Sequence, residues 1–162
     1  MRSIIIYYSY TGNTKKVAEA LAEYLQKKGE VNLLRLKALD ESTSFFGQAA
    51  RAFRHKKARI APAEWELSSY DLICLGTPVW AFAPAPAINA YLEKCSGLEG
   101  KPVLIFTTYG SGAGVNRCFN YMQDILSKKG AKNFKRFAIQ QFKVSDKEFI
   151  TKIITEELKL FN

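Results

Sequence analysis

Short runs of apolar residues alternate with longer amphipathic segments along this chain. The run at residues 3–8 (SIIIYY) is almost continuously apolar and rich in β-branched and aromatic side chains, a pattern typical of a strand that is buried on both faces. Residues 14–28 repeat apolar side chains at helical spacing from Val17 to Leu25, and Gly29 follows as the expected helix end. The chain is therefore predicted to begin with a strand, a loop and a helix.

The same alternation continues to the end of the chain. Ser145 is the expected N-cap of the last helix, and residues 61–69 are expected to form a loop with Trp65 and Leu67 packed in the core. Strands that alternate with helices indicate an α/β fold, in which helices cover both faces of a five-stranded parallel sheet. The further strands are predicted at residues 31–36, 71–76, 103–107 and 134–139, and the further helices at residues 43–59, 87–94, 116–129 and 146–160.

The composition is that of one folded domain over residues 1–162. With 48% hydrophobic and 24% charged residues, the chain can form a single packed core. No apolar run approaches the roughly 20 residues that a membrane-spanning helix needs. The first predicted strand also starts too early to leave room for a signal peptide. We therefore expect a cytoplasmic protein that does not bind membranes.

The cysteines and the single histidine do not suggest a metal site or a disulfide framework. Cys74, Cys95 and Cys118 show no CxxC spacing, and Cys74 lies in an apolar run that predicts a core position. His55 lies in a basic cluster without a second candidate ligand nearby, so we expect it at the surface.

The net charge of +9 is concentrated in two basic segments. Residues 51–59 (RAFRHKKAR) contain five cations and no acid, and a second cluster occupies residues 128–136. Such segments attract acidic partners or nucleic acid. No nucleic-acid-binding motif accompanies them, so nucleic acid is not an expected partner.

The loop after the first predicted strand has the composition of an anion site. Ser9, Tyr10, Thr11, Gly12, Asn13 and Thr14 bring hydroxyls, an amide and a glycine to the start of a helix, where free backbone N–H groups favour an anion. The loop has no lysine of the GxxxxGK[ST] type and no GxGxxG pattern. These features favour a monophosphate over a nucleoside triphosphate or a dinucleotide, and a hydroxyl-rich helix cap is the alternative.

Two further loops follow neighbouring strands and should meet the first at the carboxyl edge of the sheet. Residues 77–84 (TPVWAFAP) contain Trp80, which we expect to be exposed and able to stack on a flat ring. Residues 107–114 (TTYGSGAG) contain Tyr109 and three glycines that allow close backbone approach to a ligand. Each aromatic residue taken alone could equally be a packing residue, but together with the phosphate loop they favour a site for a flat-ringed phosphate ester.

The motifs YYSYTGNT, GTPVWAFAPAP and TTYGSGAG resemble the flavodoxin family in its short form, over nearly the whole chain. The resemblance implies a flavodoxin-like three-layer sandwich with strand order 2-1-3-4-5 and non-covalently bound FMN. It also implies that Trp80 and Tyr109 flank the isoalloxazine ring, and that Ser9, Thr11, Asn13 and Thr14 hold the phosphate. The complete set of expected cofactor-binding residues is Ser9, Tyr10, Thr11, Gly12, Asn13, Thr14, Thr77, Pro78, Val79, Trp80, Ala81, Thr108, Tyr109, Gly110, Ser111, Gly112 and Gly114.

The sequence departs from the family pattern in two places. Electron-carrying flavodoxins are typically acidic around the flavin, whereas residues 77–84 and 107–114 contain no Asp or Glu. The lack of nearby acids should make full reduction of the flavin easier. Ala81 stands where the family often has glycine, at a position where a positive φ costs alanine roughly 1 kcal/mol more than glycine.

Three functions remain open at this point. The first is an FMN protein that carries electrons between redox partner proteins, with acidic partners favoured by its charge. The second is an FMN-dependent NAD(P)H oxidoreductase that reduces quinones, in which small residues such as Ala83, Ala85 and Gly112 leave the flavin face open. The third is an interaction module without flavin. No catalytic side chain is expected, because the flavin would supply the chemistry. The choice between monomer and homodimer stays open.

Overall fold

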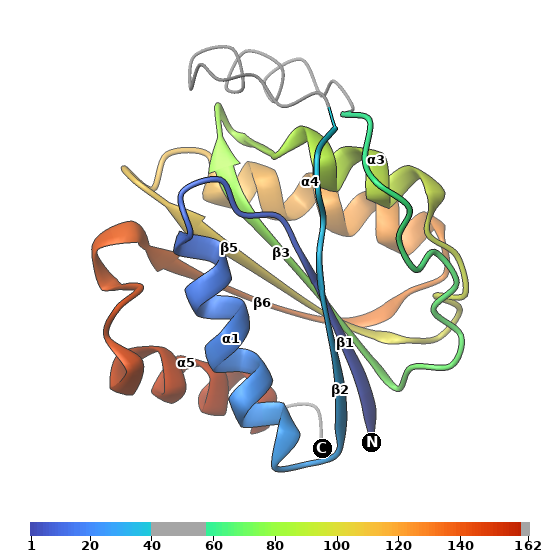
Figure 1. Ribbon diagram of the computed structural model, residues 1–162, viewed down its shortest axis with the longest axis horizontal. Helices are drawn as coiled ribbons and strands as arrows, with labels where there is room; N and C mark the ends of the chain where they lie inside the picture. The colour runs from blue at the N-terminus through green and yellow to red at the C-terminus, as the bar shows by residue number, and fades with distance from the viewer. Residues whose placement is uncertain (40–57, 160–162) are drawn as a thin grey trace.

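A central parallel sheet organises the molecule, and a computed structural model describes it over residues 1–39 and 58–159. Five long strands lie in the order β2-β1-β3-β5-β6, and the short β4 pairs antiparallel with β3 (Figure 1). Counted along the chain, the long strands follow the predicted order 2-1-3-4-5, so the predicted fold class is confirmed. The strands are β1 (Arg2–Tyr7), β2 (Glu30–Arg35), β3 (Leu72–Trp80), β4 (Ala83–Pro84), β5 (Pro102–Tyr109) and β6 (Lys132–Gln140).

Helices cover both faces of this sheet (Figure 1). Successive side chains of β1 point to opposite faces, so Ile4 and Ile6 pack in the cluster that includes α3 and α4, and Ile5 and Tyr7 in the cluster that includes α1 and α5. All four side chains are buried. The helices are α1 (Asn13–Gln26), α3 (Pro86–Lys94), α4 (Val115–Lys128) and α5 (Lys147–Lys159), with a 3-10 helix at Gln141–Lys143.

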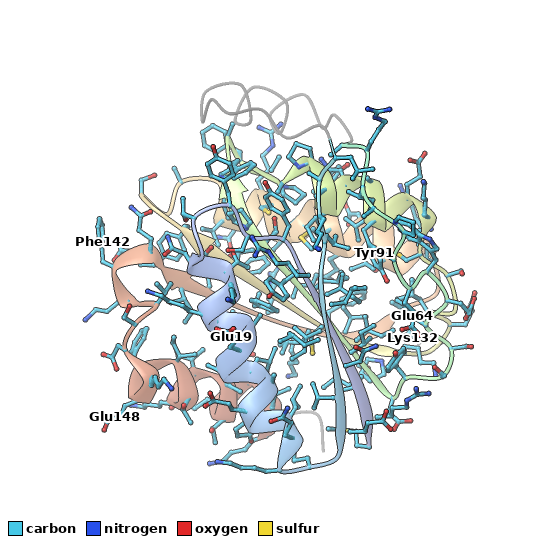
Figure 2. All side chains as sticks on the ribbon, in the orientation of Figure 1. Glu19, Glu64, Tyr91, Lys132, Phe142 and Glu148 are labelled. Carbon is cyan, nitrogen blue, oxygen red and sulfur yellow. The ribbon has the colours of Figure 1, made fainter. Side chains whose placement is uncertain are left out.

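The connection before β3 packs as expected. Leu67 is fully buried, and Trp65 is half-buried with its ring stacked on Tyr91 at a centroid distance of 5.3 Å. Tyr91 lies inside the molecule (Figure 2), and its hydroxyl donates a hydrogen bond to the Glu64 carbonyl.

The strand predicted at residues 71–76 is longer than expected. In the structure β3 continues to Trp80, because Thr77 and Pro78 pair with Thr107 and Thr108 of β5. The sequence pattern suggested an end at Gly76 because glycine and proline usually interrupt strands. Pairing with β5 overrides this local signal, and with β4 at Ala83–Pro84 only Ala81 and Phe82 of the predicted loop 77–84 lie outside strands.

The N-cap of the last helix was predicted at the wrong residue. The Oδ1 of Asp146 accepts a hydrogen bond from the Phe149 N–H at 3.0 Å, which is the N-cap contact of a helix that begins at Lys147. Ser145 instead accepts a hydrogen bond from Lys16 Nζ at 3.0 Å. Ser and Asp are both common N-cap residues. Because α5 begins at Lys147, Asp146 is the residue that occupies the N-cap position.

Most of the helix predicted at residues 43–59 and of the basic segment 51–59 lies outside the described residues. The described end of this stretch is not helical. Ala58 is buried, and the Arg59 carbonyl accepts a hydrogen bond from the Leu39 N–H at 2.7 Å. An isolated antiparallel bridge joins Ala38 and Ile60.

All three cysteines are buried as free thiols. Burial raises the pKa of the Cys95 thiol to about 11 and that of Cys118 to about 12. The predicted core position of Cys74 is confirmed, since its side chain is fully buried. In the part of the chain that the structure describes, no cluster of His, Cys, Asp or Glu could hold a metal ion. None of the described helices has the length and apolarity needed to span a bilayer.

Replacement of the α5 cap tests the corrected assignment. We expect Asp146→Ala to lower the free energy of unfolding by about 1 kcal/mol, because the Phe149 N–H loses its acceptor. Urea denaturation measures the change. Ser145→Ala is the matched control and should change the stability by less than about 0.5 kcal/mol, since it removes only an exposed contact. The reverse order of the two effects would contradict the assignment.

Candidate functional site

The carboxyl ends of β1, β3 and β5 bring three loops together at one edge of the sheet (Figure 1). Two adjacent cavities, of about 230 Å³ and about 170 Å³, open at this edge and share Val79, Tyr109 and Gly110 as walls. The larger cavity is lined by Tyr10, Thr11, Asn13, Thr14, Pro78, Val79, Trp80, Thr108, Tyr109, Gly110 and Gln141. The smaller one is lined by Val79, Ala81, Phe82, Tyr109, Gly110, Ser111, Gly112 and Ala113.

The loop between β1 and α1 leads into an open helix start. Gly12 is the N-cap of α1 with a φ of +90°, and as a glycine it has no side chain that could form a capping hydrogen bond. A Cβ at Gly12 would meet no atom within 4 Å, so the left-handed φ, rather than lack of space, is what favours glycine here. The first-turn N–H groups of a helix have no intrahelical partner. This end of α1 can therefore hold an anion.

Hydroxyl groups fix the shape of this loop. Ser9 is buried, and its Oγ accepts a hydrogen bond from the Lys15 N–H at 3.2 Å. The Thr14 and Thr108 hydroxyls share a buried hydrogen bond of 2.8 Å, which ties the helix start to β5. The loop is thus held on both sides before any ligand arrives, which reduces the ordering cost of binding.

Trp80 does not have the exposure that the sequence suggested. Its side chain is only 6% exposed, and its ring meets those of Tyr8 and Tyr10 edge to face, at centroid distances of 5.7 Å and 5.8 Å. The expectation of an exposed tryptophan is therefore wrong. Trp80 forms part of the wall of the larger cavity, while the half-buried Tyr109 contributes to both cavities.

A strained hairpin closes one side of the smaller cavity. Trp80 pairs with Ala83, so Ala81 and Phe82 form a two-residue turn in which φ is +45° and +70°. Turns of this kind strongly prefer Asn-Gly, because positive φ strains residues that carry a Cβ. Phe82 remains 42% exposed at the cavity. Without an Asn-Gly signal, the sequence did not reveal this hairpin or single out Phe82.

Gly114 allows this hairpin to pack on the start of α4. A Cβ at Gly114 would lie 2.6 Å from the Phe82 Cα, and Gly114 itself has a φ of +83°. Close approach and backbone conformation both require glycine here. The third loop is also held from β6, where Gln140 Nε2 donates a hydrogen bond to the Gly110 carbonyl at 3.2 Å.

Most of the predicted site residues lie at the two cavities. The exceptions are Ser9, Gly12, Thr77 and Gly114, which do not contribute to either lining. Thr77 is fully buried, and its Oγ1 accepts a hydrogen bond from the Ala85 N–H at 2.9 Å, so it supports the chain after the hairpin. Ser9, Gly12 and Gly114 act on loop shape, as described above.

Two polar residues at the site were missed by sequence reasoning. Gln141 lines the larger cavity from the 3-10 helix, next to Phe142, which is 80% exposed and points away from the molecule (Figure 2). Arg35 donates a hydrogen bond from its guanidinium to the Ser9 carbonyl at 3.0 Å. The predicted strand order could have suggested Arg35, because the second strand ends beside the first. Within residues 1–39 and 58–159, neither cavity lining contains an Asp or a Glu.

Comparisons with known proteins agree with this geometry. A family model described as NADPH-dependent FMN reductase matches residues 1–143. An NAD(P)H dehydrogenase (quinone) from Brucella ovis is 31% identical over 108 residues, which cover 65% of this chain and 52% of the relative. The chain spans about half the length of the curated relatives it matches.

Two solved structures share the fold. A flavoprotein from Lactobacillus acidophilus, in complex with FMN, has a TM-score of 0.68 at 22% identity, with 90% of this chain and 97% of that chain covered. Oxidised flavodoxin 1 from Bacillus cereus has a TM-score of 0.65 at 18% identity, with 98% of each chain covered. At these identities the likeness establishes the flavodoxin-like fold.

Relief of the hairpin strain provides a test of the turn geometry. We expect Ala81→Gly to raise the free energy of unfolding by roughly 0.5–1 kcal/mol, because glycine adopts a positive φ without strain. The same change at Ala90, inside α3, should instead lower it by about 1 kcal/mol, since glycine disfavours helix interiors. Thermal or urea denaturation measures both. A loss of stability at position 81 similar to that at position 90 would contradict the strained turn.

Proposed function

We propose a reductase function from one premise: this chain belongs to the NADPH-dependent FMN reductase family. It has a flavodoxin-like fold and binds FMN. The proposed activity is transfer of two electrons from a reduced nicotinamide dinucleotide, through FMN, to a small planar acceptor of the quinone class. The name of the Brucella ovis relative, NAD(P)H dehydrogenase (quinone), supports this donor and this acceptor.

The residues at the site fit FMN at both ends. The start of α1, where the N-cap Gly12 has no side chain to cap the helix, and the hydroxyls of Thr11 and Thr14 suit a phosphate. The neutral walls of the smaller cavity, among them Ala81 and Ser111, suit a flat heteroaromatic ring. Bound FMN supplies the redox chemistry, since its ring accepts a hydride and passes two electrons on. The protein contributes binding, orientation and electrostatics.

The observation that carries the proposal is the character of the smaller cavity. Among the residues that the structure describes, its lining contains no charged side chain, and small residues such as Ala81, Gly112 and Ala113 leave space inside the cavity. Carboxylates at this position would oppose the negative charge that arrives with a hydride. A neutral and sterically open site instead favours reduction and access by a second flat molecule.

The second candidate function is electron transfer between proteins. The same fold occurs in flavodoxin 1 from Bacillus cereus, and the exposed Phe82 at the cavity could contact a docked partner. The net charge of +9 would then favour acidic redox partners by electrostatic steering. Direct reaction with reduced nicotinamide separates the two candidates.

Rapid mixing of the FMN-loaded protein with NADPH and with NADH tests the reductase proposal. We expect at least one of them to bleach the yellow absorbance of the flavin at about 1–1000 s⁻¹, the usual range of enzyme turnover. Addition of a quinone should then restore the colour. Dithionite serves as the control that shows the flavin to be reducible. Bleaching by dithionite but by neither nicotinamide would favour the carrier function instead.

Partial filling of the smaller cavity tests where the acceptor binds. We expect Ser111→Leu to lower kcat/KM for the quinone about tenfold, because added bulk blocks the approach of the acceptor. Because Ser111 also lines the space proposed for the flavin ring, the assay is run at an FMN concentration that saturates both variants, so that the loss reports on the acceptor. Ser69→Leu is the matched control: Ser69 is also exposed, but it lies in the turn before β3 at the opposite edge of the sheet. Equal loss of activity in both variants would argue against this acceptor position.

A further inference from the structure

The side chain of Arg35 places a positive charge beside the loop at residues 9–14, although Arg35 belongs to a different strand. It is the last residue of β2 and pairs with Tyr7 of β1, two residues before Ser9. Its guanidinium donates the 3.0 Å hydrogen bond to the Ser9 carbonyl described above. Burial raises the pKa of the Tyr7 phenol, and the charge of Arg35 opposes part of that rise. Strand pairing therefore places Arg35 beside the loop.

The two lysines in the first turn of α1 have partners elsewhere. Lys15 Nζ lies 3.6 Å from a carboxylate oxygen of Glu19, one turn further along the helix. Lys16 Nζ donates its hydrogen bond to Ser145 at the start of the α5 region. Both lysines are close to the loop in sequence, but the contacts of their ammonium groups are with Glu19 and Ser145. Within residues 1–39 and 58–159, Arg35 is the cation whose side chain donates a hydrogen bond to the loop itself.

We propose that Arg35 is a positioning residue for the phosphate of FMN, and that it makes the site distinguish FMN from riboflavin. A phosphate monoester carries about −1.5 to −2 charges near neutral pH. A guanidinium next to the loop adds a favourable potential to that of the α1 N-terminus. Its hydrogen bond also fixes the Ser9 peptide, from which the loop turns toward the helix. Riboflavin has the same ring and ribityl chain but no phosphate, so it gains little from this charge.

This inference rests on the placement of the phosphate at residues 9–14, which the proposed function also uses. It adds that the selectivity for the phosphorylated flavin comes from a residue outside that loop. An exposed arginine at the end of an edge strand tolerates substitution, so the variants needed for the test should fold.

The test compares the binding of FMN and riboflavin to apoprotein by quenching of flavin fluorescence. We expect Arg35→Gln to weaken FMN binding about tenfold, a binding change typical of one charge-assisted contact. Riboflavin binding should change by less than about twofold. Arg35→Lys should recover part of the FMN affinity because it keeps the charge. The difference between wild type and Arg35→Gln should shrink as salt is added.

Lys37→Gln is the matched control, since Lys37 is an exposed cation two residues further along the chain. It should leave the affinity for both flavins nearly unchanged. Three results would overturn the proposal: unchanged FMN binding in Arg35→Gln, equal weakening of FMN and riboflavin, or a loss in Lys37→Gln equal to that in Arg35→Gln. A wild-type protein that binds both flavins equally would instead refute the phosphate placement on which the proposed function also depends.

Discussion

Parallel pairing of β1 between β2 and β3 is the constraint on which the site depends. The register sets Tyr7 of β1 opposite Arg35 on one side and Gly76 on the other. Because all three strands run in the same direction, the loop after β1 emerges between the end of β2 and the continuation of β3. That arrangement supplies the phosphate loop with a cation from one neighbour and an aromatic wall from the other. A shift of one residue would exchange the side chains of the two buried faces, so that Ile5 and Tyr7 would have to fit the space that Ile4 and Ile6 fill.

Local sequence patterns were sufficient for the long strands and helices of the described residues, and they led to the proposal of a phosphate site at residues 9–14. Apolar runs such as residues 3–8 identify buried strands without knowledge of the strands they pair with. The composition of residues 9–14 predicts an anion site. Features that depend on tertiary contacts could not be predicted from local sequence patterns. The extension of β3 depends on β5, and the burial of Trp80 depends on the rings of Tyr8 and Tyr10. The position of Arg35 depends on its pairing with Tyr7 of β1.

The strained hairpin links stability to the shape of the cavity. Ala81 and Phe82 both adopt positive φ in a turn that glycine and asparagine would form more easily. The turn persists because Trp80 is anchored in the core on one side and Phe82 packs against Gly114 on the other. Strain of this kind survives only where the surroundings determine the backbone, which is common at ligand sites. Here the hairpin packs against the loop before α4, and both line the smaller cavity, which is the space proposed for the flavin ring.

The uneven distribution of charge between the two ends of the site favours a reductase. The helix start, the hydroxyls and Arg35 gather at the end proposed for the phosphate, whereas the described walls at the end proposed for the ring are neutral. Binding free energy that comes from the phosphate does not require the protein to enclose the ring. The ring face can then stay open to a donor and an acceptor in turn without loss of the cofactor. An open, neutral cavity beside the proposed ring position is of use to an enzyme that admits small molecules in turn, and this is the physical reason for preferring the reductase proposal.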